Sequence, residues 1–239
     1  MNKELIKKRF SKSLKTYGDS AQAQSKMAEK LVSLIQDSDY DSVLELGCGV
    51  GTATSFLFSE KISNYDAVDI VSGCKNYIKN LSDKINFICE DIEVFNPDKK
   101  YDLIFSNATL QWVENLPKFI KKYMEFLNFD GVFAFTIFGE ENYKEINSII
   151  NGGLSYHTVS EMKTLLKNYQ ILHLDEEKIL LDFKDIKDVL HHIKDTGVNA
   201  LYEAHWTKKD LQNFEKDFLK INRKIQLTYN PIYIVIKNK

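Results

Sequence analysis

The sequence predicts one α/β domain built around a mostly parallel β-sheet. Short apolar segments alternate with stretches of helical periodicity, a pattern typical of right-handed βαβ units. Three glycines at alternate positions follow the first apolar segment, where a strand would turn into a helix. A chain of 239 residues, 44% of them hydrophobic, is enough for one large core, so we expect residues 1–239 to form a single domain.

Two amphipathic helices open the chain and are expected to form an N-terminal cap over residues 1–38. The first, at 3–17, carries on one face Leu5, Ile6, Phe10, Leu14 and Tyr17. The second, at 20–36, carries Ala23, Met27, Leu31, Leu34 and Ile35 in the same spacing. Gly18 is expected to separate the two helices.

The alternating part of the chain follows. Its predicted strands are 42–47, 65–70, 85–89, 101–106 and 131–138. Its predicted helices are 52–60, 73–81 and 116–127. Residues 139–166 do not fit this repeat and are predicted to form a lid-like insertion above the sheet.

The last third of the chain has a different rhythm. We expect a strand or bent hairpin at 169–183 and helices at 185–195 and 207–222. The β-branched and aromatic run 226–236 predicts one final strand, with Pro231 tolerated near a strand start or a bulge.

Charge and composition exclude several classes of partner. A net charge of −2 gives no basic field for a nucleic acid, and no apolar run reaches the roughly 18 residues of a membrane span. The basic N-terminus lacks the apolar segment of a signal peptide, so we expect a cytoplasmic protein. Cys48, Cys74 and Cys89 show no metal-ligand spacing and are expected to be free thiols, with no metal site.

The glycine run is the strongest chemical signal in the chain. Glu45 precedes Gly47, Gly49 and Gly51, and this order resembles the first motif of class I S-adenosylmethionine (SAM) methyltransferases. Thr52 stands where the dinucleotide fingerprint requires its third glycine, which argues against a nicotinamide dehydrogenase.

Suitable side chains follow each predicted strand, at the edge where α/β sheets bind cofactors. Gly47, Cys48, Gly49 and Gly51 are expected to wrap the methionine portion of SAM, with Glu45 holding its ammonium group directly or through water. Asp69, next to Ile70, is expected to accept both ribose hydroxyls. Asp91 and Ile92 are expected at the adenine amino group and ring face, and Asn107 and Ala108 below the sulfonium.

A more particular resemblance covers nearly the whole chain. The segments that carry it are RFS at 9–11, TY at 16–17, LQWV at 110–113, LDF at 181–183, HHIKDTGVN at 191–199 and LTYNPIY at 227–233. They resemble the malonyl-[acyl-carrier protein] O-methyltransferase (BioC) family of biotin synthesis. The acidic segment 138–143 departs from the family pattern, which is often glycine-rich there.

The resemblance implies a Rossmann-like class I methyltransferase fold with seven strands, the last one antiparallel, and SAM as cofactor. It also implies methylation of the free carboxylate of malonyl-acyl carrier protein, or of malonyl-CoA, to the methyl ester. The ester hides a charge, so that fatty-acid elongation enzymes accept the malonyl group as a primer. A carrier protein is acidic, which predicts a local basic docking patch.

A malonyl carboxylate is ionised at neutral pH and needs no general base, so alignment in a dry pocket is expected to drive the reaction. The expected catalytic residues are Tyr17, Gln111, Trp112 and Lys194, with Asn199 as an alternative to Lys194. Two other functions stay open: a methyltransferase for a small acid such as trans-aconitate, and a non-catalytic SAM-binding scaffold. The scarcity of arginine, Arg9 and Arg223 only, argues against the small-acid enzyme.

Overall fold

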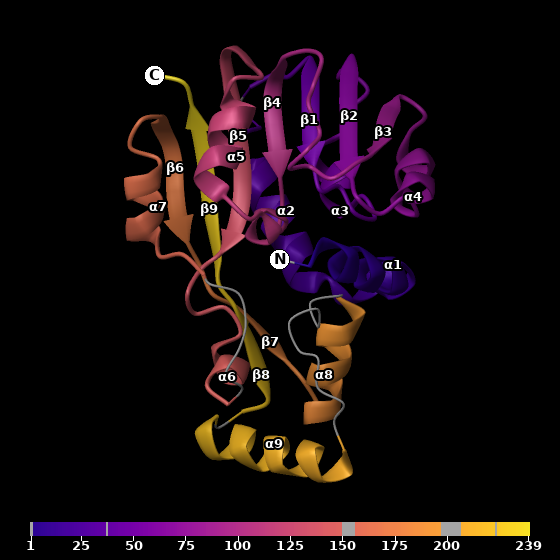
Figure 1. The fold of residues 1–239 in the computed structure, drawn as a ribbon, viewed down its shortest axis with the longest axis vertical. Helices are drawn as coiled ribbons and strands as arrows, with labels where there is room; N and C mark the ends of the chain where they lie inside the picture. The colour runs from indigo at the N-terminus through magenta and orange to yellow at the C-terminus, as the bar shows by residue number, and fades with distance from the viewer. Residues whose placement is uncertain (1, 37, 150–155, 197–206, 223) are drawn as a thin grey trace.

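The computed structural model describes residues 2–36, 38–149, 156–196, 207–222 and 224–239. Figure 1 shows a large sheet with helices on both faces, helix α1 lying across one edge of that sheet, and a smaller group of elements beyond α1. Among the described helices, none combines the length and the apolar character that a membrane span requires.

The large sheet has seven strands in the order β3-β2-β1-β4-β5-β9-β6. Their bounds are β1 Ser42–Leu46, β2 Asn64–Asp69, β3 Ile85–Cys89, β4 Tyr101–Ser106, β5 Leu127–Phe138, β6 Gln170–Glu176 and β9 Pro231–Lys237. β9 runs antiparallel to both of its neighbours, β5 and β6. The predicted Rossmann-like sheet with an antiparallel last strand is therefore confirmed.

Helices cover both faces of this sheet because the strands are apolar on both sides. On one face lie α2 (Gln22–Ser33), α3 (Thr52–Leu57) and α4 (Cys74–Leu81), where Met27 and Ile78 share a buried core with the strand residue Leu103. On the other face lie α5 (Leu116–Met124) and α7 (Val159–Leu165), where Tyr123 and Met162 pack with Phe133. Two cores sandwich the sheet, as a doubly covered parallel sheet requires.

Helix α1 (Lys3–Ser20) crosses the carboxyl edge of the parallel strands (Figure 1). The sequence predicted a break at Gly18, but the helix continues to Ser20 and ends at Ala21, whose ψ of 41° leaves the helical region. One glycine in a helix costs only about 1 kcal/mol relative to alanine, and the packing of the preceding turns outweighs that cost.

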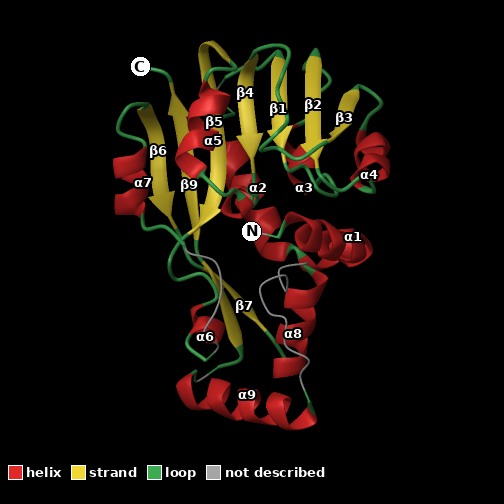
Figure 2. Ribbon diagram, viewed as in Figure 1, coloured by secondary structure: helices red, strands yellow, loops and turns green. Residues whose placement is uncertain are grey.

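The elements beyond α1, which we call the lower lobe, surround a second, two-stranded sheet (Figure 2). β7 (Ile179–Asp182) pairs antiparallel with β8 (Gln226–Tyr229), next to α6 (Lys144–Asn147), α8 (Ile186–Asp195) and α9 (Lys208–Ile221). The predicted single strand 226–236 is thus wrong in one respect: it divides into β8 and β9, which belong to different sheets. Pro231, which has no N–H to donate, begins β9 at this division.

The segment 139–166 also divides between the two parts of the molecule. Its first half contributes α6 to the lower lobe, whereas its second half forms α7, which packs beside β6 with Met162 and Leu166 fully buried. α7 is therefore the ordinary crossover helix between β5 and β6. That half of the expected lid does not lie above the carboxyl edge of the sheet.

Candidate active site

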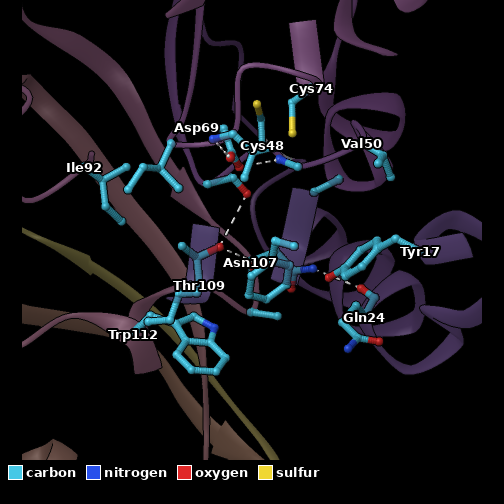
Figure 3. A pocket seen from close by; sticks show the side chains of 18 of the residues that line it. Tyr17, Gln24, Cys48, Val50, Asp69, Cys74, Ile92, Asn107, Thr109 and Trp112 are labelled. Carbon is cyan, nitrogen blue, oxygen red and sulfur yellow. Dashed lines mark hydrogen bonds between the residues drawn. The ribbon is translucent and has the colours of Figure 1, made fainter. Parts of the chain in front are cut away.

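A cavity of about 1090 Å³, its open mouth included, lies between the carboxyl edge of the sheet and α1. The expected residues that line it are Tyr17, Gly47, Cys48, Gly49, Asp69, Ile70, Asp91, Ile92, Asn107, Ala108 and Trp112. Figure 3 shows Asp69 and Cys48 on one side of this pocket, with Tyr17, Gln24 and Trp112 across from them.

The glycine loop leads from β1 into α3 with three left-handed residues. Gly47, Gly49 and Gly51 have φ of +79°, +53° and +84°. A Cβ at Gly47 would lie 2.3 Å from Thr109 Oγ1, whereas one at Gly49 would meet no protein atom within 4 Å. Gly49 thus leaves cavity space open beside the backbone. Gly51 does not line the cavity and instead allows close packing against Leu81.

Asp69 is held rigidly at the end of β2. Its two carboxylate oxygens accept hydrogen bonds from the backbone N–H of Gly49 (2.9 Å) and of Val71 (2.8 Å). Burial raises the pKa of Asp69, and these two N–H donors partly offset that rise. Each oxygen keeps a second lone pair, so the carboxylate can accept two hydroxyls of a ribose.

Glu45 does not reach the cavity, although it was expected to hold the cofactor ammonium. The side chain is 1% exposed, and its Oε2 accepts hydrogen bonds from Thr54 Oγ1 (2.6 Å) and the Tyr65 hydroxyl (2.7 Å). Burial raises the pKa of Glu45 to about 7. Glu45 therefore ties β1 to α3 and β2 beneath the loop.

Asp91 and Ile92 line the cavity beyond β3, as expected. The Asp91 carboxylate is already engaged, because Lys3 Nζ lies 2.6 Å from its Oδ2 and also pairs with Glu93. Burial lowers the pKa of Lys3, but the two carboxylates outweigh it and the net shift is upward. These ion pairs hold the start of α1 against the cavity.

The turn after β4 is held by a hydrogen-bond network. Thr136 Oγ1 donates to Asn107 Oδ1 and accepts from the Ala108 N–H, each at 2.8 Å. Gln111 Nε2 donates to the Ala108 carbonyl at 2.7 Å. Ala108 itself has a φ of +50°. Gln111 does not line the cavity, so the structure places it behind the turn and not against a substrate.

The remaining wall is aromatic. The rings of Phe10 and Trp112 meet edge to face, with centroids 5.8 Å apart, and Phe10 also contacts Tyr17 at 6.3 Å. Burial raises the pKa of Tyr17, so its hydroxyl stays protonated at neutral pH. Tyr17 and Trp112 are therefore brought to the cavity as expected.

Lys194 is not brought there. It lies exposed on α8 and is absent from the cavity lining, because the buried face of that helix consists of Ile186, Val189 and Ile193. Asn199 lies outside the described residues.

Several lining residues were missed by the sequence analysis. They are Lys3, Ile6, Phe10, Leu14, Gln24, Val50, Thr52, Ala53, Val71, Cys74, Glu93, Thr109 and Val113. The apolar face of the first helix was recognised, and it was a usable signal: Ile6, Phe10, Leu14 and Tyr17 repeat at helical spacing. The pattern does not reveal that this face covers a cavity rather than a core.

The residues that line the cavity fit SAM. The glycine loop opens space against the backbone, Asp69 offers a fixed carboxylate for hydroxyls, and Ile92 offers an apolar surface for a ring. Aromatic and aliphatic side chains of α1 close the other side of the cavity.

Comparisons with known proteins agree with this geometry. Residues 20–192 match a family model described as a methyltransferase domain. The malonyl-[acyl-carrier protein] O-methyltransferase of Calditerrivibrio nitroreducens is 38% identical over 98% of this chain and 96% of its own length. The enzyme of the same name from Haemophilus influenzae is 35% identical over 99% of this chain and 95% of its own length.

Among solved structures, coclaurine N-methyltransferase bound to N-methylheliamine and S-adenosylhomocysteine (SAH) matches with a TM-score of 0.59. It is 14% identical and covers 91% of this chain and 71% of its own. The N-methyltransferase NodS from Bradyrhizobium japonicum in complex with SAH matches with a TM-score of 0.54 at 12% identity, covering 93% and 98%. These structures show the shared fold, and the full-length relatives show the family: the chain belongs to the SAM-dependent methyltransferases and, among them, to the malonyl-[acyl-carrier protein] O-methyltransferases.

Proposed function

We propose that this enzyme transfers a methyl group from SAM to the free carboxylate of a malonyl thioester on acyl carrier protein, or on CoA, as an early step of biotin synthesis. The observation that carries the proposal is the cavity in which the glycine loop, Asp69 and an aromatic wall meet beneath α1. Relatives named for this activity match 98% and 99% of the chain.

SAM supplies an electrophilic methyl group on a sulfonium, and the acceptor carboxylate is already a nucleophile near pH 7. The enzyme is therefore left with alignment and desolvation. Phe10 and Trp112 provide apolar surface, and α1 shields the cavity from water. Loss of water favours a reaction in which opposite charges cancel. The protonated Tyr17 hydroxyl can donate a hydrogen bond that orients a carboxylate oxygen.

The small-acid alternative finds less support in this cavity. A polyanion needs several free cations, but Lys3 is the one cation among the described lining residues and is paired with Asp91 and Glu93. A malonyl thioester brings one carboxylate only. The rest of this substrate is a flexible arm, which can lie against the apolar wall of the cavity.

Intact-mass spectrometry tests the proposal directly. Malonyl-carrier protein incubated with enzyme and SAM is expected to gain the mass of one methylene, and acetyl-carrier protein, which lacks a free carboxylate, is expected to gain none. Malonyl-CoA and trans-aconitate serve as competing acceptors. Turnover of trans-aconitate alone would establish the small-acid enzyme, and SAM binding without any turnover would establish the scaffold.

A further inference from the structure

Gln24, on α2, carries a polar atom with no assigned use. It is 4% exposed, lines the cavity, and its Oε1 has no hydrogen-bond partner among the described residues. A buried carbonyl oxygen without a donor costs roughly 1–3 kcal/mol, so such an atom indicates a ligand that donates to it. An amide oxygen accepts hydrogen bonds and cannot donate them.

The position of Gln24 in the cavity places it near one end of the cofactor. Asp69 and Asp91 line the cavity and are the expected ribose and adenine contacts. Figure 3 shows Gln24 beside Tyr17, across the pocket from Asp69. Asn107 Nδ2 donates to the backbone carbonyl oxygen of Gln24 at 3.0 Å, which fixes the helix to the turn after β4. The part of SAM that extends away from the ribose is its amino-acid end, and the donor at that end is the α-ammonium group.

The Gln24 carboxamide lies next to the lower lobe. It is close to the Tyr229 hydroxyl at the end of β8 and lowers the pKa of Tyr229, while burial raises it. Tyr229 also accepts from the Tyr143 hydroxyl at 2.8 Å and lies 2.6 Å from His192 Nε2. Tyr229 and Tyr143 are 0% and 2% exposed, so this network is dry.

The donors and acceptors around Tyr229 indicate how the Gln24 amide is oriented. Burial lowers the pKa of His192 to about 4, so at neutral pH the imidazole is uncharged and its Nε2 can accept the single proton of Tyr229. The lone pairs of Tyr229 are then left for the Tyr143 hydroxyl and for the neighbouring Gln24 amide, which lowers the Tyr229 pKa as an N–H donor does. With its nitrogen turned toward Tyr229, Gln24 has its oxygen free.

We propose that Gln24 is a cofactor-binding residue whose Oε1 accepts a hydrogen bond from the α-ammonium of the methionine end, and that Tyr229 is the positioning residue that orients it. Gln24 thus takes the role that the sequence had given to Glu45. The inference rests on the proposed function only through its methyl donor and does not depend on the acceptor.

Calorimetry with two ligands tests the ammonium contact. SAH carries the amino-acid end, and 5′-methylthioadenosine keeps the adenine and ribose but lacks the α-amino group. Gln24→Met, which is close in shape but has only a weakly accepting sulfur, is expected to weaken SAH by roughly ten- to a hundredfold and to leave methylthioadenosine unchanged. Gln24→Glu keeps an acceptor oxygen and is expected to preserve the wild-type ratio of the two affinities. Gln22→Met, exposed on the same helix, is the matched control.

Equal weakening of both ligands would overturn the proposal, because a merely structural Gln24 would affect them alike. Unchanged SAH affinity with a raised KM for the malonyl thioester would also overturn it and would assign Gln24 to the acceptor. For Tyr229, the readout is coupling: Tyr229→Phe is expected to weaken SAH severalfold, and Tyr229→Phe with Gln24→Met no more than Gln24→Met alone. Additive losses would remove the positioning role. Failure of malonyl-thioester methylation would leave all these binding results unaffected.

Discussion

The carboxyl edge of the sheet and the lower lobe are built from different kinds of sequence information. At the edge, one short segment sets the geometry: Gly47 and Gly49 take left-handed conformations within a single turn, and Asp69 binds the loop from the adjacent strand. The lower lobe instead depends on pairing between β7 and β8, which are distant in the chain. Local motifs therefore specify the cofactor site, and long-range packing specifies the part of the molecule that supports it.

The largest expected effect tests whether the lower lobe stabilises the protein without forming the cofactor site. Leu227→Ala removes a fully buried side chain from β8 and is expected to lower the free energy of unfolding by about 2–5 kcal/mol. The SAH dissociation constant is expected to stay within a fewfold of wild type. Urea unfolding and calorimetry measure the two quantities, with Leu180→Ala, exposed on the paired strand, as control. A proportionate loss of SAH affinity would show that the two regions are one unit.

Glu45→Gln tests the assignment of Glu45 to the scaffold. The buried carboxyl keeps its proton up to about pH 7, whereas in the unfolded chain it ionises near 4.5. The folded state therefore binds more protons between these values, and wild-type stability falls as pH rises through that window. The difference between the folded and unfolded pKa of Glu45 corresponds to about 3 kcal/mol of stability.

The amide introduced by Glu45→Gln is neutral and does not ionise, so the decline between pH 5 and pH 8 is expected to shrink in urea unfolding curves, with SAH affinity unchanged. Glu60→Gln, at an exposed site, is the control. A tenfold loss of SAH affinity in Glu45→Gln would restore Glu45 to the cofactor site.

Asp69→Ala is expected to raise the SAM dissociation constant by roughly ten- to a hundredfold, since it removes two charge-assisted hydrogen bonds to the ribose. Methylthioadenosine, which keeps the ribose, is expected to weaken equally, in contrast to the Gln24 variants. Asp83→Ala, at an exposed acid just before β3, is the control. Unchanged affinity for both ligands would exclude Asp69 from ribose binding.

The smallest effect is expected from Lys3→Ala. Its ion pairs with Asp91 and Glu93 are partly exposed, with the Lys3 side chain 29% accessible, so each is worth at most about 1 kcal/mol. Stopped-flow dissociation of SAH is expected to speed up by a factor of about five or less, and the difference is expected to shrink at high salt. Lys8→Ala on the exposed side of α1 is the control. A rate equal to wild type at low salt would mean that Lys3 does not hold the cap closed.

Sequence reasoning was most successful where one residue type permits one conformation. Positive φ at Gly49 and the acid at the end of β2 follow from local rules, and the parallel pairing of β1–β5 follows from βαβ alternation. It was least successful where identical patterns have different partners. The run 226–236 is strand-like on both sides of Asn230-Pro231. Pro231 indicates a strand start or a bulge, but nothing local shows that Tyr229 belongs to one sheet and Pro231 to another.

The same distinction explains the site residues. Glu45 and Gln24 are both polar side chains close to the predicted cofactor, and their types favour the acid as an ammonium ligand. Only the tertiary contacts favour Gln24 over Glu45. Thr54 and Tyr65 donate hydrogen bonds to Glu45, whereas the Gln24 side-chain oxygen has no partner among the described residues. Lys194 failed for a similar reason, since α8 buries its aliphatic face and exposes the lysine.

The interior place of β9 has a consequence for biosynthesis. Among the described strands of the large sheet, β6 pairs with β9 alone, and β9 leaves the ribosome more than fifty residues after β6. Until then the nascent chain must carry β5 with one edge unpaired and α7 with an incomplete surface to cover. We therefore expect cotranslational folding to stop at the β1–β5 half and the final closure to be a single late event, during which a strand edge is open to aggregation.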